Sequence, residues 1–216
     1  MFAGDYTGAV AKDLGVVSAL GDELADTGKT LIGIGMSPSG DRDEATKRNP
    51  RAAIPFTIAD YGQRGVRTIL VAIPPVTHSE RDQRGFVPTL IKFARASGVS
   101  RYVGDGANRW PAAHVLDVGD LFALALDKAP SRAALCAAAE TGVPVRTVAE
   151  SIARHLDIPT QSIDPTEVAE HFPGFPFVAT DLTMSSEATR QMLGWQPSRP
   201  RLLADLENGH YFAADA

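Results

Sequence analysis

Residues 66–73 (VRTILVAI) form the segment that most restricts how this chain can fold. The run is apolar and rich in β-branched side chains, and Pro74 and Pro75 end it. A short, nearly continuous apolar run is typical of a strand in a parallel sheet, because helices cover both faces of such a sheet. A second run of this kind, residues 30–35 (TLIGIG), lies upstream. We therefore expect two parallel strands that lie side by side.

Helical segments alternate with these strands in the first half of the chain. Residues 52–64 predict a helix with Pro55 in its first turn, where the missing N–H costs little. Residues 37–50 are polar and rich in turn-forming side chains, which indicates a surface loop. Three further segments complete the pattern: a helix at 9–25 with one apolar stripe, a helix at 88–96 and a short strand at 99–103. This alternation is typical of an α/β fold with a doubly wound, Rossmann-like parallel sheet.

The pattern changes beyond residue 130. The segments expected there are a strand at 133–139, a helix at 144–156, a short strand at 161–163, and helices at 165–172, 185–193 and 201–206. We expect two regions, with residues 1–130 as a partial Rossmann-like region and residues 131–216 as a small α/β cap that binds substrate. Open sheets bind ligands at the carboxyl ends of their strands, so the cap would form one wall of a cleft at those ends.

Composition excludes several classes of partner. The chain has 21 Lys and Arg against 26 Asp and Glu, and a net charge of −5 gives no basic patch for nucleic acid or for an anionic membrane. No apolar run approaches the ~20 residues that a bilayer requires. The first residues lack the basic and apolar regions of a signal peptide. The expected partner is a small-molecule substrate, with neither nucleic acid nor membrane.

The single cysteine also limits where the protein works. Cys136 alone cannot form an internal disulfide, and a chain with no disulfide is typical of a reducing compartment. The expected location is the cytoplasm. Because Cys136 lies in the apolar run 133–139, we interpret it as a small packing residue and not as a nucleophile.

Residues 101–128 hold the densest group of candidate site residues. Glycine turns precede Arg109, Trp110 and His114, and a helix with apolar residues at helical spacing follows. Asp117 fits the N-cap of that helix, because its carboxylate could accept a hydrogen bond from a free N–H. One interpretation is the wall of a ligand cleft. The other is an ordinary loop with Arg109 on the surface and Trp110 in the core, and the sequence leaves both open.

Three motifs together resemble a known family. They are GDGANRWPAAHVLD with the LALDK helix after it, IPPVTH at residues 73–78, and two serines at 185–186 followed by LGWQP at residues 193–197. In this order they resemble the extended or atypical short-chain dehydrogenase/reductases of the NAD-dependent epimerase/dehydratase group. The resemblance covers roughly residues 66–212. It implies NAD or NADP as cofactor, and hydride transfer to or from a small carbonyl, hydroxyl or sugar-type compound.

Two hallmarks of that family are missing from the sequence. No glycine-rich fingerprint follows an opening strand, so by the resemblance residue 1 falls after about the fourth strand of the family. We therefore expect the N-terminal cofactor-binding part to be lacking, through a late gene start or as a natural fragment. No tyrosine is followed by lysine four residues later, and the resemblance puts Arg51 and Pro55 at those two positions.

The resemblance also implies roles for particular residues. Ser37 would polarise a substrate oxygen and Arg51 would bind an anion, since a guanidinium does not release its proton at neutral pH. The remaining candidates are Gly35 and Pro74 for the cofactor, and Pro75, His78, Arg109, Trp110 and His114 for the substrate. Arg109 could equally form a surface ion pair, and His114 could equally be structural. No His, Cys or acidic pair has a metal-ligand spacing such as H-E-x-x-H, so no metal is expected.

Two hypotheses follow from different classes of protein. The first is an NAD(P)-dependent oxidoreductase or epimerase/dehydratase homologue, which could be inactive as this chain. The alternative is a non-catalytic ligand-binding or dimerisation module. In the family, the helices that correspond to residues 9–25 and 52–64 pack together in a dimer, so the resemblance also implies a homodimer.

Overall fold

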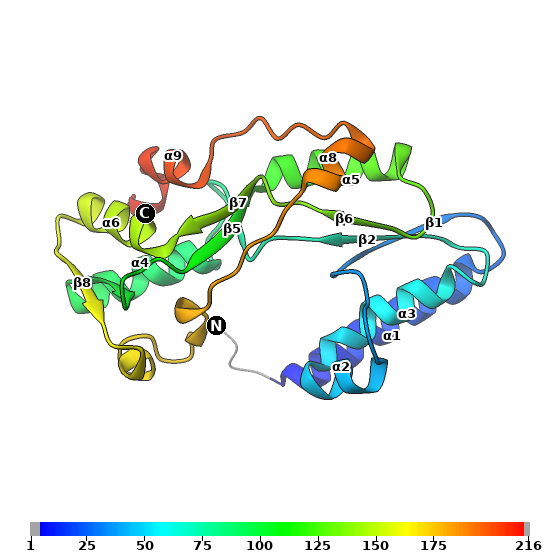
Figure 1. The fold of residues 1–216 in the computed structure, drawn as a ribbon, viewed down its shortest axis with the longest axis horizontal. Coiled ribbons are helices and arrows are strands. Elements are labelled where there is room, and N and C mark those ends of the chain that lie inside the picture. The colour runs from blue at the N-terminus through cyan, green and yellow to red at the C-terminus, as the bar shows by residue number, and fades with distance from the viewer. Residues whose placement is uncertain (1–4, 214–216) are drawn as a thin grey trace.

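Three short β-sheets follow one another along the long axis of the molecule (Figure 1). The computed structural model describes residues 5–213, in which helices and strands alternate as an α/β fold. The expected fold class is therefore confirmed. Every helix in this part of the chain is too short or too polar to cross a membrane.

The first sheet is parallel and carries the expected pair of strands. β1 (Thr30–Ile34) and β6 (Ala133–Cys136) pair in parallel with the two sides of β2 (Arg67–Ala72). Ile69 and Val71 of β2 are fully buried. The nearly unbroken apolar run of β2 is explained by its position, because helices cover both faces of the sheet at this strand.

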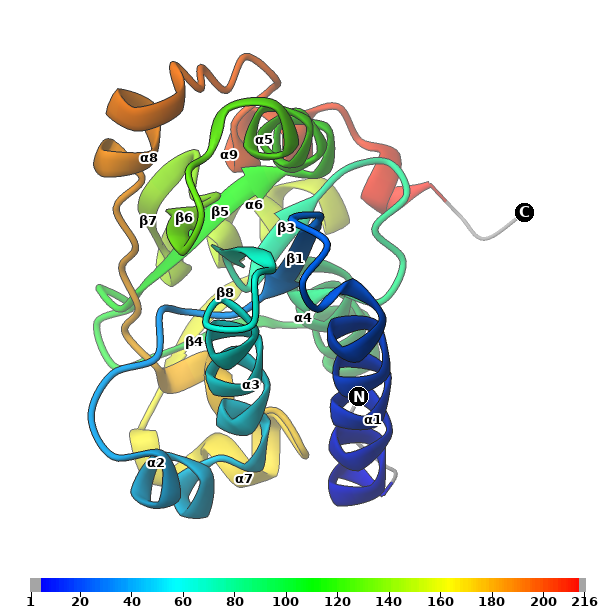
Figure 2. The same ribbon diagram turned by 90° about the vertical axis from the view of Figure 1, so that its right-hand side faces the viewer.

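Helices form a layer on each side of this sheet. α1 (Tyr6–Leu24) and α3 (Ala53–Tyr61) lie below it, and α5 (Val115–Lys128) and α8 (Glu187–Leu193) lie above it in Figure 1. Figure 2 shows the same order from the end, with α5 on the upper side and α1 and α3 below.

Two apolar clusters fill the spaces between these helices and the sheet. One side of the sheet packs Leu31 and Leu70 against Ile58, and the other packs Ile69 and Leu135 against residues of α5 and α8. α1 can approach α3 closely because Gly21 has no side chain. A Cβ atom at this position would lie only 2.2 Å from the ring of Tyr61.

The second sheet is mixed and holds the largest apolar cluster. β3 (Val76–His78) runs parallel to β5 (Arg109–His114), and β7 (Glu140–Pro144) runs antiparallel to β5. Trp110 of β5 is buried in a cluster that also receives side chains from α4 (Phe86–Ser97), α6 (Val145–Leu156) and α9 (Leu202–Glu207). The third sheet has two parallel strands, β4 (Ser100–Val103) and β8 (Thr160–Ile163), and α7 (Val168–His171) follows it.

Two sequence expectations about local structure are wrong. Residues 37–50 are not only loop, because α2 (Arg42–Arg48) lies within them. Asp41 caps this helix by accepting a hydrogen bond from the Glu44 N–H, and acidic side chains in its first turn and basic ones in its last turn favour the helix dipole.

The expected cap of α5 is also wrong. The helix begins at Val115, and His114 caps it through Nδ1, which accepts a hydrogen bond from the Leu116 N–H at 3.2 Å. Asp117 lies inside the first turn and is buried. Its carboxylate instead accepts hydrogen bonds from the backbone N–H groups of Ser198 at 2.9 Å and Arg199 at 3.1 Å. Asp117 therefore fastens the segment after α8 to α5.

The predicted division of the chain near residue 130 stays a prediction. β6 begins at Ala133, and its pairing with β2 makes a segment from beyond that position part of the first sheet. The chain then enters β7 of the second sheet directly.

Candidate functional site

The carboxyl ends of β1 and β2 meet at one edge of the first sheet. Gly35 follows β1, and its N–H donates to the Val71 carbonyl at 3.0 Å, while Pro74 lies just beyond the end of β2. The structure therefore places the two predicted cofactor residues, Gly35 and Pro74, at one sheet edge. Parallel sheets bind ligands at this edge, so the sheet edge is the candidate site.

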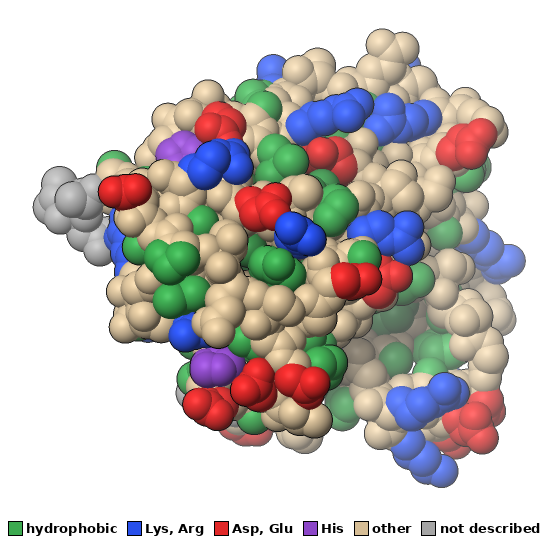
Figure 3. All heavy atoms as spheres, turned by 60° about the vertical axis from the view of Figure 1, so that its left-hand side comes forward, with side chains coloured by type: hydrophobic (Ala, Val, Ile, Leu, Met, Phe, Trp, Pro, Cys, Tyr) green, Lys and Arg blue, Asp and Glu red, His purple; other side chains and the backbone are tan. Residues whose placement is uncertain are grey.

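One face of the molecule has a hollow. Figure 3 shows this hollow at the lower right, between the main body and a lobe that carries both basic and acidic side chains. Hydrophobic side chains are visible on its walls. Apolar walls with a few polar groups at the rim are typical of small-molecule sites.

Ser37 lies against a different part of the sheet. It lines a cavity of about 170 Å³ together with Thr68 near the amino end of β2 and Ala134 of β6. The chain therefore turns back over the sheet face after Gly35. The predicted catalytic serine and the predicted cofactor residue Pro74 lie toward opposite ends of β2.

Arg51 holds two helices together. It lies in the turn before α3, and its Nη1 donates to the Asp13 carboxylate of α1 at 2.7 Å. Both side chains are about half exposed. The predicted anion-binding cation thus has an intramolecular partner, and a substrate anion would have to compete with Asp13.

Arg109 and Trp110 lie on strand β5 and not in a loop, with Arg109 in an exposed ion pair and Trp110 in the core. Nε and Nη2 of Arg109 donate to the two carboxylate oxygens of Asp181 at 3.1 and 3.0 Å. The hydrogen bonds from Arg109 lower the pKa of Asp181. Trp110 is buried, and its Nε1 donates to the Thr180 carbonyl at 3.2 Å. These residues belong to a strand, so neighbouring side chains point to opposite faces.

His78 and His114 lie together in the interior of the second sheet. Their rings meet edge to face with centroids 5.5 Å apart. Nδ1 of His78 lies 2.8 Å from Oδ2 of Asp205 on α9, and Nε2 of His78 has no hydrogen-bond partner among residues 5–213. Burial lowers the pKa of His78, although the hydrogen bond with Asp205 acts in the opposite direction. Pro75 lies in the link that leads from β2 to β3.

Sequence reasoning missed Asp205. The signal was present, because Asp205 lies three residues after Leu202 and one before Leu206, on the face of α9 that both leucines bury. A carboxylate on a buried helix face needs a partner, and His78 provides one.

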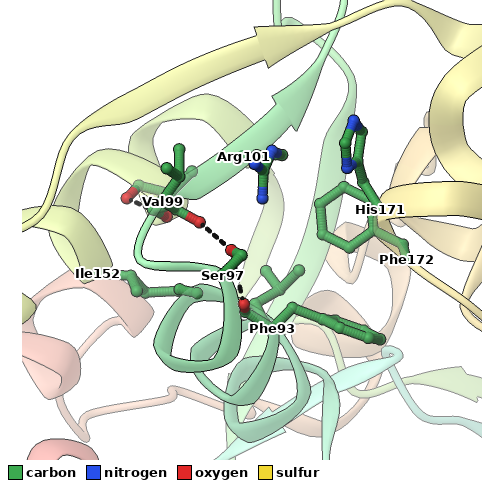
Figure 4. Close-up of a pocket in the computed structure, with 11 residues that line it drawn as sticks. Phe93, Ser97, Val99, Arg101, Ile152, His171 and Phe172 are labelled. Carbon is green, nitrogen blue, oxygen red and sulfur yellow. Dashed lines mark hydrogen bonds between the residues drawn. The ribbon is translucent and has the colours of Figure 1, made fainter.

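The pocket drawn in Figure 4 does not qualify as a substrate site. It lies among α4, β4, α6 and α7 and has a volume of about 10 Å³, which is room for about one water molecule. The Ser97 hydroxyl lies 2.9 Å from the Phe93 carbonyl and 3.0 Å from the Val99 carbonyl.

Two other kinds of chemistry find little support in the described residues. Burial raises the pKa of Cys136, which keeps the thiol protonated and makes it a poor nucleophile. Within residues 5–213, no three His, Cys, Asp or Glu side chains are grouped so that they could hold a metal ion.

The described residues do not fit the pyrophosphate of NAD or NADP. A pyrophosphate binds where a glycine turn leads from a strand to the free N–H groups of a helix. After β1 that position is α2, where Asp41 already accepts from the Glu44 N–H and the first turn is acidic. After β2 the chain continues with Pro74 and Pro75, which have no N–H to donate.

His78 should make stability depend on pH. Its pKa in the folded protein is below the ordinary value of 6.5, so the unfolded chain binds a proton more readily than the folded one. The free energy of unfolding is therefore not reduced by His78 above about pH 6.5. It falls as the pH drops below that value, because the unfolded chain then takes up a proton on His78 that the folded chain does not. We expect His78→Asn, whose amide can still donate to Asp205, to flatten the loss of Tm between about pH 7 and 5. Thermal unfolding followed by circular dichroism measures this, and an equally steep loss in both proteins would contradict it.

The chain has relatives among fungal proteins. It is 37% identical over 218 residues to uncharacterized protein C2A9.02 of Schizosaccharomyces pombe, which covers 96% of this chain and 73% of that protein. It is 39% identical over 158 residues to uncharacterized protein YLL056C of Saccharomyces cerevisiae, which covers 72% of this chain and 52% of that protein. No protein-family model matches the chain.

Two solved structures of similar fold are those of a dehydratase and an epimerase. dTDP-glucose 4,6-dehydratase from Bacillus anthracis, in complex with NAD, has a TM-score of 0.69 at 14% identity and covers 98% of this chain and 70% of that one. UDP-glucose 4-epimerase from Thermus thermophilus, also in complex with NAD, has a TM-score of 0.63 at 19% identity. The match covers 94% of this chain and 69% of the epimerase. The chain thus belongs to the family of the S. pombe protein C2A9.02 and has the Rossmann-like fold of NAD-dependent epimerases and dehydratases.

Proposed function

We propose that this chain is a short-chain dehydrogenase/reductase-like homologue of the NAD-dependent epimerases and dehydratases. With NAD or NADP it would act on a small carbonyl or hydroxyl compound or on a sugar-type substrate, in the cytoplasm. The observation that carries the proposal is the shared edge of β1 and β2, where Gly35 and Pro74 lie. Similarity to enzymes solved with NAD over almost the whole chain supports it.

The proposal assigns the described residues to the substrate side of the site. Arg51 remains the candidate cation for a substrate anion, in exchange for Asp13. Ser37 is the candidate hydroxyl by the resemblance alone, because it lies toward the other end of β2. When bound, NAD or NADP would supply the hydride acceptor or donor. The pyrophosphate finds no cradle among residues 5–213, so binding of the whole coenzyme is the first point to test.

A second candidate is a non-catalytic ligand-binding or dimerisation module. Two observations favour it: Arg51 is tied to Asp13, and Pro55 lies in the first turn of α3. By the resemblance, these two residues stand where the family has its proton-transfer tyrosine and lysine. A proline carries no charge that could lower the pKa of a neighbouring phenol.

Coenzyme titration separates the two candidates. Under the enzyme proposal, NADH or NADPH binds saturably at micromolar concentration, followed by fluorescence. Ile34→Glu should weaken binding at least about ten-fold, because it adds a negative charge beside Gly35 at the carboxyl end of β1 and the coenzyme is itself an anion. Leu126→Glu on α5 is the matched control, since Leu126 is 54% exposed and Ile34 is 53% exposed. No binding at millimolar coenzyme favours the non-catalytic module.

We also propose a homodimer that uses α1. Val16 and Leu20 are 60% and 50% exposed, and their spacing puts both on one face of the helix. We expect light scattering to give the mass of two chains, and Leu20→Lys to shift the protein toward one chain. Leu116→Lys on α5, where the side chain is 52% exposed, should leave the mass unchanged. A monomer at every concentration would reject this proposal.

A further inference from the structure

A cavity of about 80 Å³ lies where β7, α8 and the segment before α9 meet. It shares none of its lining residues with the sheet edge that carries Gly35 and Pro74. Its lining residues are His78, Ala139, Glu140, Arg190, Pro197, Arg199, Pro200 and Arg201. Three arginines therefore contribute to the lining of this small cavity.

Hydrogen bonds hold Arg190 at the wall of this cavity. Its Nε lies 3.0 Å from the Ser186 hydroxyl, and its Nη2 donates to the carbonyl of Ala139, another lining residue, at 3.1 Å. The guanidinium also lies over the ring of Trp195 at 5.4 Å. A fixed guanidinium loses less conformational entropy when it binds an anion.

Arg199 and Arg201 come from the segment that Asp117 anchors. The buried carboxylate of Asp117 accepts from the backbone N–H of Arg199, so this stretch of chain is held although its side chains are exposed. The Arg199 side chain has a distant partner, Asp120, at 3.5 Å in an exposed pair. Arg201 enters no ion pair within residues 5–213, and the two cations are therefore weakly engaged.

The carboxylate of Glu140 does not cancel these charges. Its Oε2 accepts a hydrogen bond from the Leu202 N–H at 2.7 Å, at the N-terminus of α9. The lining residues themselves thus comprise three arginines and one glutamate, and the carboxylates of Asp120 and Asp205 lie just behind them, against Arg199 and His78.

His78 is the one fully buried side chain among the lining residues. Asp205 fixes its ring through Nδ1 at 2.8 Å. The charged and titratable groups around the ring come from several elements. They are Asp205 of α9, Glu140 of β7, His114 of β5, Asp82 in the loop before α4, and His210 and Tyr211 after α9. The cavity thus runs from exposed arginines to a buried imidazole.

We propose that this cavity binds a small oxyanion, either phosphate or a carboxylate. The guanidinium fork matches both groups with paired hydrogen bonds, and the volume suits a single anionic group and not a nucleotide. The proposal is independent of coenzyme binding at the sheet edge.

Calorimetric titration of the intact chain with inorganic phosphate, and separately with acetate, tests the proposal. We expect saturable binding of at least one anion in the millimolar range or tighter, and the tighter one identifies the class. Arg199→Gln with Arg201→Gln should weaken binding by roughly ten-fold or more, because it removes two charge-assisted contacts. Both side chains are exposed, so this variant should keep its fold, which circular dichroism checks.

The matched control is Lys47→Gln with Arg48→Gln on α2, which removes the same charge from an exposed helix. It should leave anion binding unchanged. An equal loss in both double variants would mean general charge attraction and would overturn the proposal, as would the absence of saturable binding by either anion.

The ring nitrogens of His78, followed by NMR, report where the anion binds. An anion beside the imidazole favours its protonated form, so saturating anion should raise the pKa of His78 in the natural chain. The arginine double variant should show no such rise. Anion binding that leaves the His78 signals and their titration unchanged would place the anion elsewhere and reject the cavity.

Discussion

The fold depends on β2, which is hydrogen-bonded on both sides and covered on both faces. Its fully buried residues, Ile69 and Val71, contact the apolar cluster under α5 and α8, and Leu70 contacts the cluster under α3. The strand ends because Pro74 and Pro75 offer no N–H for a sheet ladder. The chain then passes into β3, so the ends of β2 and β6 lead directly to the second sheet. The position of the sheet edge, and of Gly35 and Pro74 on it, follows from this arrangement.

Buried polar groups tie the late part of the chain to this frame. Asp117 holds the segment after α8, and Asp205 on α9 holds His78 at the end of β3. A buried carboxylate without its partners would cost on the order of 1–3 kcal/mol, so each pair specifies one arrangement of the segments that it joins. The same two anchors shape the cavity lined by arginines, because they fix its inner end and its outer segment.

Sequence patterns predicted the elements better than they predicted the contacts. The strands at 30–35 and 66–73 and the long helices follow from local periodicity, and the structure contains them. The cap of α5 could not be read in this way, because Asp117 has its partners 81 and 82 positions away and His114 takes the cap. For Arg109 the deciding partner is Asp181, 72 positions away, and local sequence does not show which carboxylate an arginine will meet.

The candidate site follows the same rule. Gly35 and Pro74 lie at the same edge of the sheet, because the carboxyl ends of neighbouring parallel strands meet there. Ser37 did not join them, since the chain turns back over the sheet after β1. The resemblance to epimerases and dehydratases therefore predicts the arrangement of strands and helices. It does not predict where the candidate catalytic side chains lie, because their positions do not follow from the periodicity of the sequence.

Amide hydrogen exchange tests the central claim, which is that β2 is the middle strand of a parallel sheet, between β1 and β6. Amides of residues 69–71 should exchange only when the whole domain unfolds, with a free energy equal to that of global unfolding from denaturant titration. Amides of Ser37, Ser39 and Gly40, in the segment between β1 and α2, should exchange far faster. Equal exchange in the two segments would contradict this account of the fold and of the site at its edge.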